Sequence, residues 1–179
     1  MFNYNVDVRE IVEEIGASVY ADAPLSLDVL DVGEEHFTLR QPAMVNVTIS
    51  NAGEGLVAYG TVSAEVTATC SRCLCEFPTV IEGEVEGFYL RPGERAHHDA
   101  EEEVGAVDMN GMVDLGPALL AALVIEAPYA PLHDEECQGL CPTCGTDLNA
   151  GPCSCDHEVD PDHPFAGLAG LLGGEEESG

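Results

Sequence analysis

Five cysteines lie close together in the last third of this chain: Cys137, Cys141, Cys144, Cys153 and Cys155. Two of them belong to the sequence Cys141-Pro-Thr-Cys144-Gly, which has the C-x2-C-G spacing of a zinc knuckle. In a knuckle, a tight turn containing proline and glycine directs two thiolates at one metal ion. No other stretch restricts the fold as much, because ligation of a structural ion itself supplies folding free energy.

A second C-x2-C turn, Cys70-Ser-Arg-Cys73, lies far upstream and is followed closely by Cys75. Eight cysteines with two such turns predict a metal-binding protein. A disulfide framework and a redox-active C-x2-C pair are the two alternatives. Neither turn opens a helix in a βαβ pattern, as a thioredoxin-type redox pair does, and a reducing compartment favours metal binding over disulfides.

The spacing predicts one or two zinc ions per chain. Cys153 and Cys155 most simply complete a site with Cys141 and Cys144. Because two thiols separated by one residue are hard to place on one tetrahedral ion, Cys137 is an alternative to one of the later pair.

The upstream pair, Cys70 and Cys73, either joins Cys137 in a second site or closes onto the knuckle. His133 is a candidate fourth ligand of that second site, although a lone histidine is more often an ordinary surface residue. Cys75 is interpreted as an extra thiol.

Alternation of apolar and polar residues from Phe37 onward predicts antiparallel strands. The clearest strand covers residues 56–69, preceded by a strand around residues 45–50 and followed by one around residues 77–86. The first C-x2-C turn is therefore expected between two paired strands. Residues 2–15 show a short alternation and then a helical pattern, whereas residues 17–34 are weakly patterned and are expected to be irregular or at an edge.

One apolar helix is predicted over residues 115–126, capped by Asp114 and followed by Pro128. Apolar residues surround it almost entirely, which predicts that it is buried against the sheet. Residues 91–112 lack periodicity and are expected to form a mobile acidic loop, in which His97 and His98 resemble a solvated pair more than metal ligands.

The expected fold is α+β, with an antiparallel sheet or partly open barrel, one buried helix and a small C-terminal zinc-binding module. The predicted domains are a mainly-β domain at residues 1–130 and a zinc-knuckle module at residues 131–172, which ends in a short helix. Residues 173–179 are expected to form a disordered acidic tail.

The charge is unusual, since 34 acidic residues face five arginines and no lysine, giving a formal net charge of −29. Such a surface repels phosphate backbones and anionic membranes and attracts basic partners. A proteome-wide acidic bias would give the same composition. The N-terminus has no signal-peptide pattern and no apolar run is long enough for a membrane span, so a cytoplasmic protein is expected.

Several ordered motifs together resemble one known family: Ala-Thr-Cys70-Ser-Arg-Cys73-Leu, Asp114-Leu-Gly-Pro117, the cysteine run from Cys137 to Cys155, and Asp162-His-Pro-Phe165. In this combination the chain is similar to the YceD family of bacterial large-subunit ribosomal RNA accumulation proteins, over essentially its whole length. The resemblance implies a factor needed for normal levels of 23S ribosomal RNA, with no known catalytic activity. Cys75 departs from the family pattern, where an acidic residue is usual.

A zinc-stabilised binding factor in ribosome biogenesis is therefore the function that we expect. The charge favours a basic ribosomal or ribosome-assembly protein as its partner, with only indirect association with ribosomal RNA. No small-molecule substrate is expected, because no nucleophile is arranged with a base and an orienting group. A thiol-redox protein or a metallochaperone is the alternative, and an acidic nucleic-acid mimic would rest on charge alone.

Overall fold

The computed structural model describes residues 3–93 and 104–155 of the chain. These residues belong to two compact units, Met1–Cys137 and Gln138–Gly179, which are described separately. None of the helices in the described ranges is long and apolar enough to cross a membrane.

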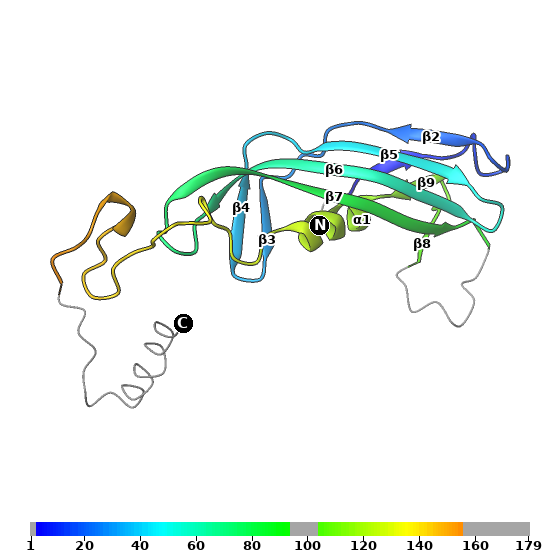
Figure 1. Cartoon of the computed structure of the whole chain (residues 1–179). Helices are drawn as coiled ribbons and strands as arrows, with labels where there is room; N and C mark the ends of the chain where they lie inside the picture. Colours follow the sequence, from blue (N-terminus) through cyan, green and yellow to red (C-terminus); the bar gives the residue numbers. More distant parts are fainter. Residues whose placement is uncertain (1–2, 94–103, 156–179) are drawn as a thin grey trace, which may run out of the picture. The chain divides into compact units, whose positions relative to one another are not determined.

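The first unit is built on an open antiparallel sheet, whose three longest strands are β5 (Met44–Asn51), β6 (Leu56–Thr69) and β7 (Glu76–Leu90) (Figure 1). The shorter strands of this sheet are β2 (Ser18–Ala21), β3 (Val29–Val32), β4 (Glu35–Leu39) and β8 (Gly105–Ala106). β2 pairs with β5, β4 pairs with β6 and β3, and only β8 runs parallel to its neighbour, β7. The sheet does not close into a barrel, so the open form of the predicted architecture is confirmed.

The predicted strands of the sheet core are confirmed, because β6 pairs with β7 along its whole length. Alternate residues of these strands are buried, including Val62, Ala64 and Val66, none of which is exposed to solvent. The segment at residues 17–34, expected to be irregular or at an edge, contains β2 and β3, which lie at the two ends of the strand order β2-β5-β6-β4-β3. These are short edge strands, whose conformation depends on pairing with β5 and β4 more than on their own sequence.

The helix α1 (Gly116–Glu126) packs against the sheet at β7. Gly83 permits this contact, because a Cβ atom there would lie 2.4 Å from the carbonyl oxygen of Ala122. Within the helix, the side chains of Leu119 and Leu123 are fully buried, but Ile125 remains 76% exposed. The prediction of a helix buried against the sheet is therefore correct for the side that carries Leu119 and Leu123, whereas Ile125 lies outside the buried side.

Asp114 was expected to be the N-cap of this helix, but the cap position is Leu115 and Asp114 ends strand β9 (Met112–Asp114). Its carboxylate still accepts hydrogen bonds from the backbone N–H groups of Gly116 and Tyr4, both at 2.9 Å. The same side chain therefore satisfies a donor of the first helical turn and one of the N-terminal segment.

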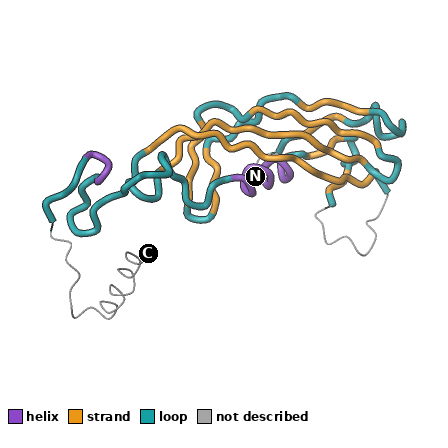
Figure 2. The backbone as a smooth tube through the Cα atoms, viewed as in Figure 1, coloured by secondary structure: helices purple, strands orange, loops and turns teal. Residues whose placement is uncertain are grey.

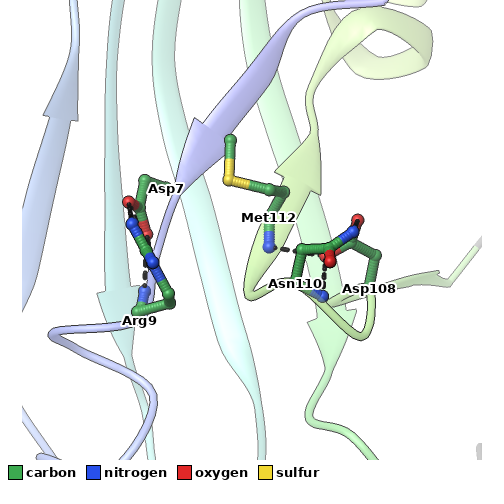
Figure 3. A network of polar contacts seen from close by, with 5 residues as sticks. All are labelled: Asp7, Arg9, Asp108, Asn110 and Met112. Atoms are coloured by element: carbon green, nitrogen blue, oxygen red, sulfur yellow. Dashed lines mark hydrogen bonds and ion pairs between the residues drawn. The ribbon is translucent and has the colours of Figure 1, made fainter.

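A second, small sheet pairs β9 with β1 (Asn5–Asp7), and polar contacts hold the turns beside it (Figure 3). The carboxylate of Asp108 accepts from the backbone N–H groups of Asn110 and Met112, each at 2.8 Å. In the facing turn, Arg9 Nε donates to Asp7 at 2.9 Å. The helical pattern expected after β1 is wrong: residues 9–16 form turns and a bend, of which Ile11 is buried and Gly16 has a positive φ.

The loop predicted at residues 91–112 is ordered at its end, where β8 and the Asp108 turn lie. Residues 94–103, which include His97 and His98, lie outside the described residues. The same is true of the short C-terminal helix and the acidic tail that were predicted beyond residue 155.

The second unit has little regular structure in its described part, as the long loops in Figure 2 show. Leu140 and Asp147 form an isolated bridge, which a 3-10 turn over Leu148–Ala150 follows. The side chain of Asn149, in this turn, accepts a hydrogen bond of 2.8 Å from the backbone N–H of Gln138 and so ties the turn to the start of the unit. A segment with so few apolar contacts needs another source of stability, and its cysteines supply a candidate.

Candidate metal centres

The first C-x2-C turn lies between β6 and β7 and has a defined hydrogen-bond pattern. The backbone N–H of Leu74 donates to the carbonyl of Cys70 at 2.9 Å, and the N–H of Cys70 donates to the carbonyl of Cys75 at 2.8 Å. Leu74 adopts a left-handed conformation, with φ 61°. Because the chain reverses this tightly, Cys70 and Cys73 are both buried on the same side of the turn.

The second C-x2-C turn repeats this pattern in the other unit. The N–H of Gly145 donates to the carbonyl of Cys141 at 2.8 Å, and the N–H of Cys141 donates to the carbonyl of Thr146 at 2.8 Å. Gly145 takes the left-handed position, with φ 73°, that Leu74 takes in the first turn. Two segments with different flanking structure thus adopt the same knuckle, which indicates a shared requirement at the cysteines.

Each knuckle belongs to a set of four potential ligands whose donor atoms all lie within 4.8 Å of one another. The hairpin cluster consists of Cys70, Cys73, His133 and Cys137, and the knuckle cluster of Cys141, Cys144, Cys153 and Cys155. Three cysteines with one histidine, and four cysteines, are both donor sets of structural zinc sites.

The distances within the hairpin cluster fit a tetrahedral ion. The sulfurs of Cys70 and Cys137 are 3.9 Å apart, and Cys73 Sγ lies 3.4 Å from His133 Nδ1. With zinc–sulfur bonds of about 2.3 Å and zinc–nitrogen bonds of about 2.0 Å, tetrahedral geometry requires about 3.8 Å between sulfurs and about 3.5 Å between sulfur and nitrogen. The side chains are therefore already close to the separations that an ion would impose.

Hydrogen bonds lower the pKa of one thiol in this cluster. Burial alone would raise the pKa of Cys70, but bonds from the side chain and backbone of His133 and from the turn backbone lower it to about 5. The hydrogen bond from the Cys75 backbone lowers the pKa of Cys73. Burial and the neighbouring thiols of Cys75 and Cys70 raise this pKa by more, so the net shift is upward. A bound cation would favour the thiolate form of every cysteine that coordinates it.

The segment that supplies His133 and Cys137 is fixed to the first turn through its backbone. Ser71 donates its N–H to the carbonyl of Pro131 at 2.8 Å. Arg72 Nη1 donates to the carbonyls of Glu135 and Cys137, both at 2.9 Å. The two residues between Cys70 and Cys73 thus position the ligands that come from more than 60 residues later in the chain.

The knuckle cluster is more exposed, with Cys141 buried, Cys144 exposed and the later pair half-buried. Backbone N–H groups of Cys144 and Thr143 lower the pKa of Cys141 to about 6, against the effect of burial. The thiol of Cys144, followed by burial and the thiol of Cys141, raises the pKa of Cys155 to about 12. A bound cation would favour the thiolate form of Cys155, against this upward shift of its pKa.

The seven cysteines that the sequence offered as ligands lie in the two clusters, all except Cys137 in pairs that the two C-x2-C turns and the Cys153-Ser-Cys155 segment bring together. Cys137 lies with Cys70 and Cys73, while Cys153 and Cys155 both lie with the second knuckle. Cys75 belongs to neither set, although its sulfur is 3.2 Å from that of Cys73. His133 was only a secondary candidate, since its sole sequence signal is its position four residues before Cys137.

The sequence matches the family described as "Large ribosomal RNA subunit accumulation protein YceD" over residues 58–172, a range that includes both clusters. Two proteins named as uncharacterised, from Mycobacterium tuberculosis and Mycobacterium bovis, are each 26% identical over 185 residues, which cover 90% of this chain and 88% of theirs. A Mycobacterium leprae protein, also named as uncharacterised, is 28% identical over 120 residues, or 67% of this chain and 55% of its own. No solved structure matches the chain.

Proposed function

Because this chain belongs to the family described as large ribosomal RNA subunit accumulation protein YceD, we propose that it is a non-catalytic, zinc-binding factor of ribosome biogenesis. Proteins of this family are not known as enzymes. The role is to support the accumulation or processing of 23S ribosomal RNA. The observation that carries the zinc part of the proposal is the pair of matching knuckles, each with a complete set of four donor atoms.

In this proposal the chain binds two zinc ions, one per cluster, and their function is structural. Four protein ligands leave no open position for a water or a substrate, which is the arrangement of structural rather than catalytic zinc. Zinc bound in small modules contributes on the order of 10 kcal/mol to folding. The second unit, with its single 3-10 turn in the described part, depends on this contribution most.

The partner in this proposal is a basic ribosomal or ribosome-assembly protein. Support comes from the net charge of −29 and from the absence of Lys and Arg between Cys137 and Cys155, where phosphate contacts of a zinc module would be expected. Negative charge steers basic proteins toward this chain and keeps nucleic acid away. Association with ribosomal RNA is then indirect.

Metal analysis and cell growth test the two parts separately. Purified chain should contain two zinc ions, Cys73→Ser and Cys144→Ser should each contain one, and Cys75→Ser should keep both. A folded wild-type chain without zinc would refute the metal part. Deleting the gene should lower the ratio of large to small ribosomal subunits on a sucrose gradient, and an unchanged ratio, including under cold stress, would refute the biogenesis part.

A thiol-redox function is the second candidate, since the exposed thiol of Cys75 lies 3.2 Å from Cys73. Glutathione disulfide would oxidise the two thiols to a Cys73–Cys75 disulfide, with two molecules of reduced glutathione as the other product, and Cys73 would leave the hairpin cluster. A glutathione redox buffer separates the two functions: rapid thiol–disulfide exchange without unfolding would favour redox chemistry. Chelator-induced unfolding, with no exchange in the zinc-bound chain, would favour the structural role.

A further inference from the structure

One face of the large sheet has no cover among the described helices and strands. The helix α1 lies along the opposite face (Figure 1). It meets β7 at Gly83, and the buried side chains of β6 and β7 point to the same side as the helix. Because side chains alternate between the two faces of a strand, Glu82, Glu84 and Glu86 point away from the helix, and all three are exposed.

Large apolar and aromatic side chains share this uncovered face. The register places Tyr20, Thr48, Tyr59 and Glu86 side by side across β2, β5, β6 and β7. Tyr20 is 74% exposed and Tyr59 is 53% exposed. In a parallel row, Met44, which is 70% exposed, lies beside Ser63 and Glu82. Exposed aromatic and apolar groups gathered on one face are typical of interaction surfaces.

The glutamates on this face have no cationic partner within the described part of the chain. The ion pairs found there join Arg9 to Asp7 and His36 to Asp31, and neither includes one of these three glutamates. Alternate residues of a strand are about 7 Å apart, so the three carboxylates form an evenly spaced negative row. Like charges in such a row repel one another until a cation binds between them.

We propose that this uncovered face, bounded by Glu82, Glu84 and Glu86 on one side and by Tyr20 and Tyr59 on the other, binds a Lys- or Arg-rich segment of a partner protein. One side-chain chemistry satisfies both parts of the surface. Lysine and arginine pair with carboxylates and also bind to the faces of tyrosine rings. Nucleic acid is a poor occupant, because its phosphates would meet the glutamates. The choice of a basic protein as partner rests on the proposed function. The binding surface and the spacing of its carboxylates are new.

The spacing of the carboxylates predicts the form of the segment. An extended chain with a cation at every second residue repeats at about 7 Å, which matches the spacing of Glu82, Glu84 and Glu86. A segment whose cations are consecutive in an extended chain presents half of them to the other side. Alternating basic sequences are therefore expected to bind best.

The test uses the zinc-loaded full chain and two labelled peptides of equal composition, one alternating arginine with threonine and one with its arginines in a block. Fluorescence anisotropy at about 150 mM salt, where the screening length is about 8 Å, should show tighter binding of the alternating peptide. The variant E82Q/E84Q/E86Q should bind it about tenfold more weakly, equivalent to about 1.4 kcal/mol. Tyr59→Ala should also weaken binding, although it leaves the net charge unchanged.

The matched control is E10Q/E13Q/E14Q, which removes the same charge from three exposed glutamates outside the strands. It should alter affinity by less than about twofold, or about 0.4 kcal/mol. Equal weakening by both triple variants, or no effect of Tyr59→Ala, would reduce the interaction to the general field of the chain and overturn the proposal. Tighter binding of naked ribosomal RNA than of the peptide, lost in E82Q/E84Q/E86Q, would overturn it in favour of RNA.

Complementation of a deletion strain keeps this proposal apart from the proposed function. The E82Q/E84Q/E86Q chain should retain both zinc ions but fail to restore the large-subunit level, whereas E10Q/E13Q/E14Q should restore it. Full rescue by both would reject the surface and leave the biogenesis role intact. A deletion strain with normal subunits would reject the biogenesis role, whatever the peptide titration shows.

Discussion

Arg72 donates a hydrogen bond of 2.9 Å from Nη1 to the backbone carbonyl of Cys137, and so joins the first knuckle to a candidate ligand 65 residues later in the chain. The same nitrogen donates to the carbonyl of Glu135. This side chain is not itself a ligand, but it holds the backbone that carries one. Contacts of this kind orient metal ligands and affect metal affinity strongly.

Arg72→Ala is therefore expected to weaken zinc binding at the hairpin cluster by about tenfold or more, the usual effect of removing a group that orients a ligand. The knuckle cluster should keep its affinity, because it belongs to the other unit of the chain, whereas the bonds from Arg72 to Glu135 and Cys137 hold the segment before it. Competition with a chromophoric chelator measures the two affinities. Arg40→Ala is the control, as it removes another exposed arginine, and an equal loss in that variant would contradict the positioning role.

The two knuckles predict opposite effects for exchanges at their left-handed residues. A left-handed conformation costs a non-glycine residue about 1–2 kcal/mol, so Gly145→Ala should destabilise the second unit by that amount. No atom lies within 4 Å of the added Cβ, so crowding does not contribute. Leu74→Gly should instead be neutral or stabilising by less than about 1 kcal/mol, because relieved strain is partly offset by the flexibility of glycine. Denaturation of the zinc-loaded variants measures both changes.

Stability should fall in alkaline solution through Tyr89. Burial, with a smaller contribution from the charge of Asp114, raises the pKa of Tyr89 to about 12, above the usual value of 10.0. The neutral phenol is thus favoured in the fold: its contribution is complete below pH 10 and is lost as the pH rises toward 12, with a size on the order of 2 kcal/mol. Tyr89→Phe should flatten the decline of the denaturation midpoint over this range. Tyr129→Phe, at a position 92% exposed, should leave the decline unchanged.

Direct binding of naked ribosomal RNA is expected to be weak. The five arginines are scattered over the chain and face the field of 34 acidic residues. A titration with large-subunit RNA between about 50 and 200 mM salt measures this, since proteins that grip phosphates lose orders of magnitude in affinity over that range. Sub-micromolar affinity that falls steeply with salt would identify RNA as the direct ligand.

The sequence predicted those elements whose signal is local and long. β6 and β7 alternate over 14 and 15 residues, and both knuckles follow from spacing alone. For β2 and β3 the sequence indicated only an irregular or edge segment, because four residues carry too little pattern and their strand conformation depends on pairing with other strands. The exposure of Ile125 was missed for a related reason: an apolar surface does not say how many sides of a helix will be covered.

Which residues lie together in each cluster depends on the three-dimensional fold and could not be read from the sequence. Cys137 is a neighbour of the second knuckle in sequence, but the contacts of Ser71 and Arg72 place it beside Cys70. His133 has no distinguishing sequence pattern. It lies 60 positions after Cys73 in the sequence, and only the folded chain brings the two side chains together. Such long-range placement is a property of tertiary structure rather than of spacing.

The two clusters differ in how much chain they close. Cys70 and Cys137 are 67 positions apart, whereas Cys141 and Cys155 are 14 apart. Loop-closure entropy grows with the logarithm of loop length, so an ion in the hairpin cluster would restrict the unfolded chain by about 1.4 kcal/mol more than one in the knuckle cluster. An ion in the hairpin cluster would act as a long-range crosslink of the β-sheet unit, whereas an ion in the knuckle cluster would crosslink only a short stretch of chain. Gradual removal of metal should therefore produce two separate structural transitions. One is a local loss of structure in the second unit, and the other is a cooperative unfolding of the first unit.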